Sequence, residues 1–393
     1  MKLFGKLNLK NVAVALAQVA GAYGGVMGGK LVELRIAKSK DTATLQLRGV
    51  GNQMDILSDC VLIEASAEGV FVFTWSQLES ALNWPKSKSI SELDWEIEPK
   101  EGKGDDSVHV LSVFRGRARL ETETCDEVLP AVDELTPKTK MVVDSDKFSI
   151  GLKRASSMAG KQDVRHYLNG VFLKADLGSK ADESSVVAVG TDGHRLARVN
   201  LKPLQVEGDS SSVIIPNAGV SQIEMFMNRF ASGPIALGFC DSHVVMKGTN
   251  GYRLRCQLID GQYPQYERVI PSLDSAKVVT FAKEDMDFGL GLARKSTGDG
   301  KNPIVELEFK RGLLSMKGFN RNGGSDSISK SESGFEIEGF DGTPFTTYLN
   351  ITYVQDVLTN VTLPKVEMSV YNPSQAVVVM EGDCLYVVMP SKP

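Results

Sequence analysis

Short runs of alternating apolar and polar residues recur along the whole chain, about ten residues apart, and Gly, Asp, Asn and Ser separate them. Clear examples lie at residues 43–50 (ATLQLRGV), 211–216 (SSVIIP) and 376–382 (AVVVMEG). A period of two places successive side chains on opposite faces of a strand, and the polar separators favour tight turns. The pattern therefore predicts antiparallel β-sheet as the dominant structure.

Two sets of helices are predicted between these strands, from apolar residues at helical spacing behind a capping residue. The first set begins at Asn8, at Ser145 or Asp146, and near residue 283. The second set begins near residues 75, 217 and 350, and Thr74 with Gln77 makes a capping box before its first member. Within each set, successive helices start roughly 140 residues apart.

This spacing indicates one pattern repeated three times, with an early helix, several strands, a second helix and more strands in each third. A repeat of that length is a whole domain, because solenoid units run only about 20 to 50 residues. Composition turns polar at residues 134–140 (ELTPKTK) and 269–277 (VIPSLDSAK). We therefore predict an α+β protein of three similar domains, each with antiparallel sheets plus two helices, at residues 1–137, 138–271 and 272–393.

Composition and charge narrow the class of protein. The chain has 393 residues, of which 42% are hydrophobic and 24% charged, so it can bury more than one core. Its 44 Lys and Arg residues against 49 Asp and Glu give a net charge of -5, and no global positive field draws it to nucleic acid or membrane. No run approaches the roughly 20 apolar residues of a membrane helix or forms a signal-peptide core. The five scattered cysteines without a CxxC pair predict reduced thiols in a cytosol.

Residues 189–199 (VGTDGHRLARV) carry the strongest candidate chemistry, because Asp192 and His194 lie two positions apart in a chain with four histidines. They could form a general base with its carboxylate, or one edge of a metal site. Asp192-Gly193 is also a good turn pair, and the neighbouring Thr191 and Leu196 suit the wall of a ligand pocket. HExxH, GxSxG and GxxxxGK[ST] motifs are absent from the sequence. The residues alone leave active site, pocket and plain turn open.

Five segments, in this order along the chain, carry a resemblance to a known family: 162–170 (QDVRHYLNG), 191–197 (TDGHRLA), 258–271 (LIDGQYPQYERVIP), 350–358 (NITYVQDVL) and 385–390 (LYVVMP). In combination they closely resemble the bacterial sliding clamp family, the beta subunit of DNA polymerase III. The resemblance is strong in the middle third, good near the end of the chain and thin in the first third.

The resemblance implies the DNA clamp fold and a head-to-tail homodimer, a ring of six domains with helices inside and sheets outside. It implies a non-enzymatic processivity factor with no cofactor and no metal. A loader driven by ATP would place the ring on primed double-stranded DNA, which it would hold topologically and without sequence preference. The ring would tether the replicative DNA polymerase and other clamp-motif proteins, in the cytoplasm at the nucleoid, with no membrane partner.

The family also binds partner peptides in a pocket between the second and third domains, suited to a short segment bearing Gln and then Leu or Phe. Carried over to this sequence, the pocket residues are Leu168, Thr191, Gly193, His194, Arg195, Leu196, Pro264, Arg268, Val269, Asn350, Tyr353, Val387, Val388, Met389 and Pro390. Asn350 and Tyr353 correspond to positions that receive the polar end of the peptide.

DNA contacts are expected in two places. The family touches DNA with a loop that corresponds here to Lys161, Gln162, Arg165, His166 and Tyr167, whose charged, amide and aromatic groups suit phosphate contact and base stacking. Cations on helices are candidates for the inner lining of the ring, where contacts would be sparse and salt-sensitive; they are Lys153, Arg154, Lys283, Arg294 and Lys295. A net acidic outer wall would repel the DNA backbone.

The sequence departs from the family at several of its positions. Val26 replaces an arginine expected to face DNA, His166 replaces a tyrosine, and Ser391 replaces the methionine whose thioether helps to form the pocket floor. The positions expected at the dimer edges are Leu120 and Thr122 on one side and Ala293 and Arg294 on the other. These edges are more polar than expected, so ring closure would depend on ion pairs and β-ladder bonds and be salt-sensitive.

Two rival functions remain. A clamp-like partner-binding module could have lost ring closure, and its mark would be a monomer that still binds clamp-motif peptides. A metal-dependent hydrolase could use Asp192 and His194, with His166 nearby, and bound metal or lost turnover on changing His194 would identify it.

Overall fold

In the computed structural model the chain forms two compact units, which we describe separately. Unit 1 comprises Met1–Asp146, Pro203–Ser211 and Ser221–Leu258, and unit 2 comprises Lys147–Lys202, Ser212–Val220 and Ile259–Pro393. The structure describes residues 2–23, 30–39, 42–51, 53–85, 90–100, 108–131, 135–178, 184–231, 233–248, 251–297, 302–319 and 330–392.

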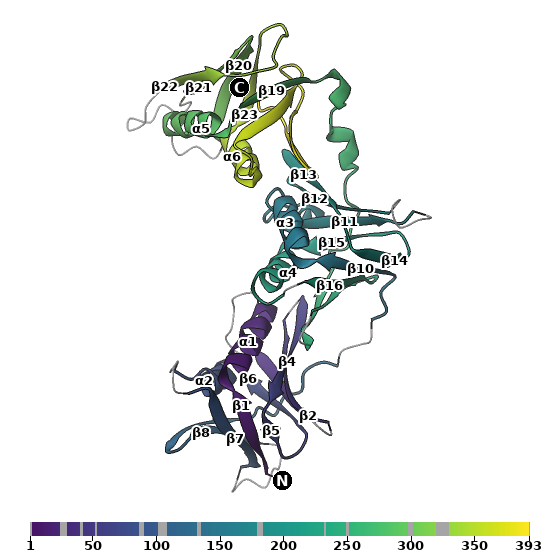
Figure 1. Ribbon diagram of the computed structural model, residues 1–393, viewed down its shortest axis with the longest axis vertical. Coiled ribbons are helices and arrows are strands. Elements are labelled where there is room, and N and C mark those ends of the chain that lie inside the picture. The colour runs from purple at the N-terminus through teal and green to yellow at the C-terminus, as the bar shows by residue number, and fades with distance from the viewer. Residues whose placement is uncertain are drawn as a thin grey trace. The chain divides into compact units, whose positions relative to one another are not determined.

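Unit 1 contains two antiparallel sheets (Figure 1). The five-stranded sheet has the order β5-β1-β7-β8-β9, with β1 at Leu3–Asn8, β5 at Glu64–Ala65, β7 at Glu92–Pro99, β8 at His109–Arg115 and β9 at Ala118–Glu123. The nine-stranded sheet has the order β14-β10-β16-β17-β18-β4-β3-β2-β6. Its strands are β2 Leu31–Lys38, β3 Ala43–Val50, β4 Met54–Leu62, β6 Gly69–Thr74, β10 Thr139–Asp144, β14 Gln205–Gly208, β16 Pro234–Phe239, β17 His243–Lys247 and β18 Arg253–Gln257. The pairing of β4 with β18 joins strands from the first and second thirds of the chain in one sheet.

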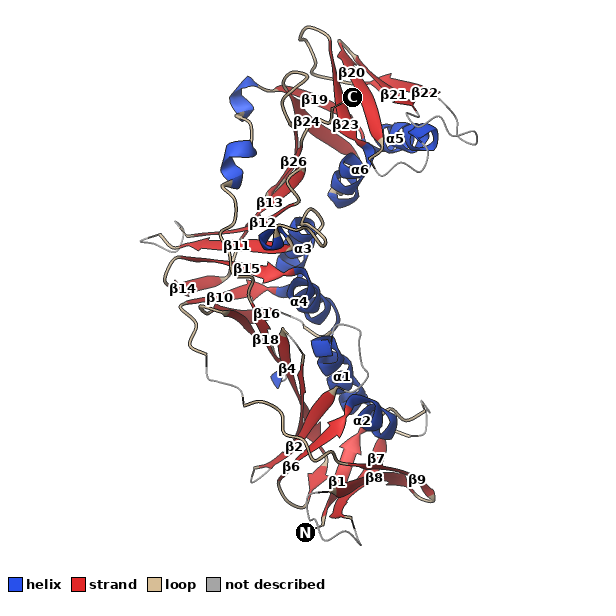
Figure 2. Cartoon of the chain, turned by 180° about the vertical axis from the view of Figure 1, so that it is seen from behind, coloured by secondary structure: helices blue, strands red, loops and turns tan. Residues whose placement is uncertain are grey.

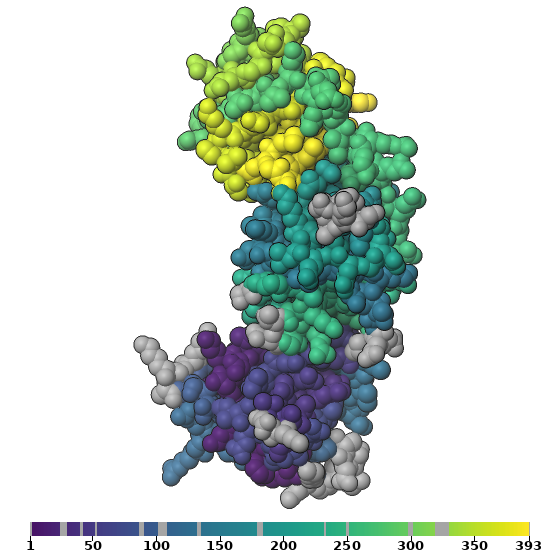
Figure 3. All heavy atoms as spheres, turned by 45° about the vertical axis from the view of Figure 1, so that its right-hand side comes forward, coloured from purple at the N-terminus to yellow at the C-terminus, as the bar shows by residue number. Residues whose placement is uncertain are grey.

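Unit 2 repeats this plan with an eight-stranded and a four-stranded antiparallel sheet. The larger has the order β15-β11-β12-β13-β26-β25-β24-β19, with β11 at Gly170–Asp176, β12 Ser185–Thr191, β13 Arg195–Leu201, β15 Ser211–Pro216, β19 Lys277–Ala282, β24 Lys365–Val370, β25 Val377–Glu381 and β26 Cys384–Val388. The smaller has the order β22-β21-β20-β23, with β20 at Ile304–Lys310, β21 Leu313–Phe319, β22 Lys330–Glu336 and β23 Phe345–Asn350. Because β13 pairs with β26, the end of the chain lies against its middle, as the yellow and teal spheres of Figure 3 show.

Helices close each pair of sheets, as the blue ribbons of Figure 2 show. The described α-helices are α1 Leu9–Val19, α2 Trp75–Leu82, α3 Ser145–Ser156, α4 Asn217–Arg229, α5 Lys283–Thr297 and α6 Ile351–Asn360. In unit 1, α1 packs on β4 and α2 reaches both β6 and β9. In unit 2, α5 packs on β21 and β22, and α6 touches both β23 and β26. The first and last thirds of the chain therefore share one arrangement, two helices between two sheets.

The predicted local signals form these elements. The Asn8 side chain caps α1 by accepting from the N–H groups of Lys10 and Asn11, and Thr74 with Gln77 makes the predicted capping box of α2. In α5, Gly289 supports close packing, because an added Cβ would lie 2.5 Å from the Met316 Sδ atom.

The α+β architecture predicted from the sequence, antiparallel sheets with helices between them, is confirmed. Residues 43–50 form β3 with the expected alternation of buried side chains. The five cysteines are free, and burial raises the pKa of the Cys60 thiol to about 12, which keeps it protonated. The three domain boundaries stay predictions, since both long sheets join strands from two thirds of the chain.

Candidate functional site

A cavity of about 170 Å³ in unit 2 gathers four separate segments of the chain. They are the short 3-10 helix His166–Leu168 with its preceding loop, the turn between β12 and β13, the 3-10 helix Tyr266–Val269 with its preceding loop, and the end of β26. The lining residues are Arg165, Tyr167, Leu168, Thr191, Gly193, Arg195, Leu196, Pro264, Gln265, Tyr266, Val269, Val387 and Met389.

The floor of the cavity is part of a buried apolar cluster. Leu168, Leu196 and Val387 are at most 2% exposed, and all three belong to one continuous hydrophobic core with Val189 and Leu385. Leu196 lies directly opposite Val387 in the β13–β26 ladder, so the sheet fixes their separation. A floor held in this way is preformed, which lowers the cost of binding an apolar side chain.

Aromatic rings support one wall of the cavity. The Phe172 and Tyr263 rings stack with centroids 4.7 Å apart, and Tyr266 meets Phe172 edge to face. The buried Tyr263 hydroxyl donates to the Val189 carbonyl at 3.3 Å, and burial raises the pKa of Tyr263 well above its usual range. The Tyr263 hydroxyl therefore stays protonated, and its hydrogen bond to Val189 holds the segment that carries Pro264 against the sheet.

The turn at 191–195 is built around the Asp192 carboxylate. Asp192 Oδ1 accepts from the backbone N–H groups of His194 and Arg195 at 2.9 and 3.1 Å, an Asx-type turn. Gly193 has a φ of +88°, and an added Cβ would lie 2.8 Å from Arg165 Nη1. The carboxylate thus bonds the backbone of His194, while the His194 ring stacks on Tyr353 with centroids 5.9 Å apart. This geometry differs from that of a base oriented by a carboxylate, in which the carboxylate bonds the imidazole ring.

Arg195 is held by two carboxylates and an aromatic ring. Its Nε donates to Asp192 Oδ2 at 3.0 Å, and its Nη1 pairs with Asp356 on α6. The guanidinium carbon lies 4.8 Å from the centroid of the Tyr353 ring. The Arg195 side chain is 11% exposed, so this positive charge is largely neutralised at the cavity wall.

Arg165 is fixed by a second aspartate. Its Nε and Nη2 donate to Asp163 at 3.0 and 2.7 Å, and Nη2 also donates to the Asp192 carbonyl at 2.8 Å. The hydrogen bonds from Arg165 lower the pKa of the Asp163 carboxyl to about 2. Arg165, proposed for DNA from the sequence, therefore lies at the rim of the cavity beside the Asp192 turn.

The structure brings together nine of the fifteen residues predicted for the pocket: Leu168, Thr191, Gly193, Arg195, Leu196, Pro264, Val269, Val387 and Met389. Val388 points to the opposite face of β26 and is buried, as the alternation of a strand requires. Asn350 is also buried and caps α6 by accepting from the N–H groups of Thr352 and Tyr353, so it does not line the cavity. His194, Arg268, Tyr353 and Pro390 lie outside the lining, and Tyr353 touches it through Arg195.

The loop predicted to touch DNA is exposed at Lys161, Gln162 and His166. His166 Nε2 lies 3.1 Å from the Asp260 carbonyl, and Tyr167 is half-buried and lines the cavity. Among the helix cations, Arg154 pairs with Glu381 at 2.7 Å and so is engaged within unit 2. Lys283 donates to the Val361 carbonyl and Arg294 to the Thr352 hydroxyl, while Lys153 and Lys295 are exposed.

Several further observations bear on the sequence predictions. Gln265 and Tyr266 line the cavity but were not predicted from the sequence. The tyrosines around Pro264 were the sequence signal that could have indicated them. Ala293 is buried against Gly318, so it is covered within unit 2. The Val26 position lies outside the described residues. Within the described chain no cluster of three His, Cys, Asp or Glu residues is placed to hold a metal, and no helix there is both long and apolar enough to cross a membrane.

The paired sheets of both units give the chain the DNA clamp fold. Over its whole length it superimposes on the whole chain of a crystal structure of the DNA polymerase sliding clamp from Pseudomonas aeruginosa, with a TM-score of 0.84 at 22% identity, a likeness of fold. Residues 142–265 match the family described as DNA polymerase III beta subunit, central domain. The beta sliding clamp of P. aeruginosa is 26% identical over 72% of this chain and 74% of its own length, and that of Escherichia coli is 23% identical over 96% of both. These matches confirm the predicted resemblance to the beta sliding clamp family.

Proposed function

We propose that this chain is a DNA polymerase processivity factor, a ring that encircles duplex DNA, tethers the replicative polymerase and recruits other proteins through the cavity of unit 2. The observation that carries the proposal is the preformed apolar floor of Leu168, Leu196 and Val387 beneath a rim of fixed hydrogen-bonding groups. Such a slot suits a short peptide whose Leu or Phe enters the floor while a Gln bonds the rim. The chain itself performs no chemistry in this role.

The ring would close through the strands at the ends of the smaller sheets. β9 ends the five-stranded sheet and β22 ends the four-stranded sheet, and each pairs on one side within the described chain. Their free edges offer backbone N–H and C=O groups to another copy. Leu120 on β9 is 41% exposed and available to a partner, whereas Ala293 is buried. We propose a head-to-tail homodimer whose closure weakens with salt, with domains at 1–137, 138–271 and 272–393.

DNA contact would be weak and topological. Lys161, Gln162 and His166 are exposed beside the cavity and would touch the backbone or a primer-template junction. Lys153 and Lys295 on helices would add salt-sensitive phosphate contacts. A polymerase held to such a ring returns to its primer terminus at a high effective concentration, which is the physical basis of processivity. We place the protein in the cytoplasm, at the nucleoid during replication, with a clamp loader as its other partner.

Light scattering on the purified chain over a salt series tests the ring. The expected result is the mass of two chains at low salt and dissociation as salt rises. A monomer at all salt concentrations that still binds a Gln-Leu-Phe peptide would instead identify a partner-binding module that does not close a ring. A metal-dependent hydrolase at Asp192 and His194 would show bound metal and turnover lost in His194→Ala.

A further inference from the structure

One face of the nine-stranded sheet in unit 1 carries cations that face one another. Along β17 and β18, Met246 and Leu254 are buried in the core, and the alternate positions point to the other face. On that face lie Lys247, Arg253 and Arg255, which we call the cation strip.

The strip is only partly balanced by carboxylates within the described chain. Lys247 lies directly opposite Arg253 in the β17–β18 ladder, and like charges in that position oppose folding. Arg255 lies opposite Asp55 on β4, but Asp55 Oδ2 already accepts hydrogen bonds from Arg48 Nη2 and Nε at 2.9 and 3.2 Å. No ion pair joins a strip cation to a carboxylate among the described residues, although the charge of Arg253 opposes the rise that burial causes in the pKa of the Asp59 carboxyl.

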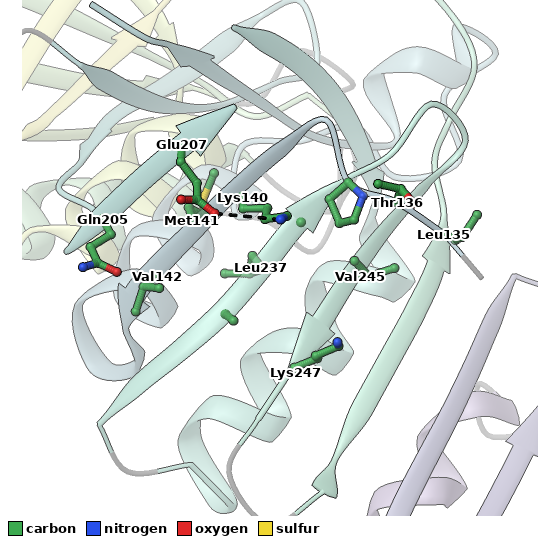
Figure 4. Close-up of a pocket in the computed structure, with 13 residues that line it drawn as sticks. Leu135, Thr136, Lys140, Met141, Val142, Gln205, Glu207, Leu237, Val245 and Lys247 are labelled. Carbon is green, nitrogen blue, oxygen red and sulfur yellow. Dashed lines mark ion pairs between the residues drawn. The ribbon is translucent and has the colours of Figure 1, made fainter. Parts of the chain in front are cut away.

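An apolar groove adjoins the strip. It has a volume of about 460 Å³, and Lys247 is one of its walls. Val142, Ala236 and Val245 from neighbouring strands line the groove, and Pro137 covers its far part above Gly238, whose added Cβ would lie 2.5 Å from Pro137. Figure 4 shows Val245 and Lys247 on one strand, β17, and Val142 on another, β10. The Lys140–Glu207 ion pair, 3.9 Å long, lies along another side of the groove.

A second hollow lies at the other end of the strip. Its volume is about 160 Å³, and Arg255, His243, Gln53 and Gln257 are among its lining residues. The strip therefore runs from an apolar groove to a hollow with hydrogen-bonding side chains. Cations beside an apolar groove complement a ligand that combines carboxylates with apolar side chains.

We propose that this face binds an extended acidic peptide segment of a protein partner, with its carboxylates on the cation strip and an apolar side chain in the groove. A peptide fits better than DNA for two reasons. The groove floor is apolar, and Glu207, together with Asp55 and Asp59 on one face of β4, would repel a continuous phosphate backbone. The surface is distinct from the peptide cavity of unit 2 and does not depend on it.

Fluorescence anisotropy with a labelled peptide of alternating Asp and Leu tests the proposal on the full chain. Binding at low salt is expected, with a loss of about tenfold or more in the double variant Lys247→Glu/Arg253→Glu. The matched control is Lys10→Glu/Lys392→Glu, which makes the same change in net charge at two exposed lysines and should bind as the unchanged chain does. Ala236→Gln, which narrows the groove without a charge change, should also weaken binding.

Three results would overturn the proposal: no binding to the unchanged chain, an equal loss in both double variants, or a short duplex DNA whose binding depends on the strip while that of the peptide does not. The last result would make the strip a nucleic-acid surface. Circular dichroism confirms that each variant is folded. A Gln-Leu-Phe peptide for the cavity of unit 2 should bind the strip variant normally, which separates this proposal from the proposed function.

Discussion

The peptide cavity of unit 2 and the cation strip of unit 1 combine charge with apolar surface in opposite ways. In the cavity each arginine has its own carboxylates, Asp163 for Arg165 and Asp192 with Asp356 for Arg195. In the strip, Lys247 and Arg253 face each other across a strand pair with no carboxylate in ion-pair range among the described residues.

The difference separates two uses of positive charge. A paired arginine has already exchanged its water for a protein carboxylate, so it fixes local shape and adds little net field for a ligand to sense. An unpaired cation beside another cation keeps its full field and raises the energy of the free protein. We therefore expect the cavity to select its ligand by shape and the strip to select its ligand by charge.

Val387→Ala sharpens the cavity side of this comparison with the largest effect. Removing two buried carbons should lower the free energy of unfolding by roughly 2 kcal/mol. It should also weaken the binding of a Gln-Leu-Phe peptide, because part of the cavity floor is lost. Val388→Ala is the matched control, because Val388 is equally buried on the opposite face of the same strand. It should cost similar stability in urea denaturation and keep peptide binding. Equal peptide loss in both variants would contradict the assigned floor.

Arg195→Met tests whether the paired arginine fixes shape. The substitution keeps an unbranched side chain but removes the guanidinium, so it leaves Asp192 and Asp356 without their cation and should cost about 1–2 kcal/mol of stability in urea denaturation. Lys174→Met, which removes an exposed pair with Asp176, should cost much less. If both variants were equally stable, Arg195 would contribute no more than a surface ion pair.

Lys247→Gln tests whether repulsion within the cation strip lowers the stability of the folded protein. Relieving the repulsion with Arg253 should raise the free energy of unfolding by up to about 0.5 kcal/mol at low salt, and the gain should vanish at high salt. Lys138→Gln serves as the control, because Lys138 is paired with Asp241 and should give no gain. A destabilising Lys247→Gln would mean that the strip is already neutralised.

The pH dependence of the cavity rim gives the smallest effect. Hydrogen bonds from Arg165 lower the pKa of Asp163 from its ordinary 3.8 to about 2, so the folded state favours the carboxylate. Because the folded pKa is depressed, the stabilising contribution is fully present above the ordinary value and is lost as pH falls from 3.8 towards 2. Carboxyl NMR should report this titration, and Arg165→Gln should move the pKa of Asp163 upwards. An unchanged pKa in the variant would show that Arg165 is not the cause.

Much of the fold followed from the sequence because its signals are local. Alternation located strands such as residues 43–50, and the side chains of Asn8 and Thr74 located helix starts within one residue. The turn at Asp192-Gly193 was also predictable from the sequence, since the Asp192 side chain accepts a hydrogen bond from the backbone N–H of His194 within the turn. The pairing of strands from different thirds of the chain was not predictable from the sequence, because a pairing such as that of β4 with β18 depends on tertiary packing.

The candidate site was predicted in part for the same reason. Family correspondence found most of the cavity floor, but Tyr266 was missed because its place depends on stacking with Phe172 from a distant strand. Asn350 was assigned to a ligand, and in the structure its side-chain oxygen caps the first turn of α6. The cation strip was invisible, since a one-residue shift in the β17–β18 register would move Lys247 away from Arg253.

Retention on nicked circular DNA tests the central claim, that this divergent chain is a working sliding clamp. The chain would be loaded by a clamp loader with ATP, washed with salt, and the circle then cut at one site. We predict that the protein stays on intact circles and slides off once the DNA has ends. Equal loss from circles and linear DNA, by a protein that loads and has the mass of a dimer, would contradict it.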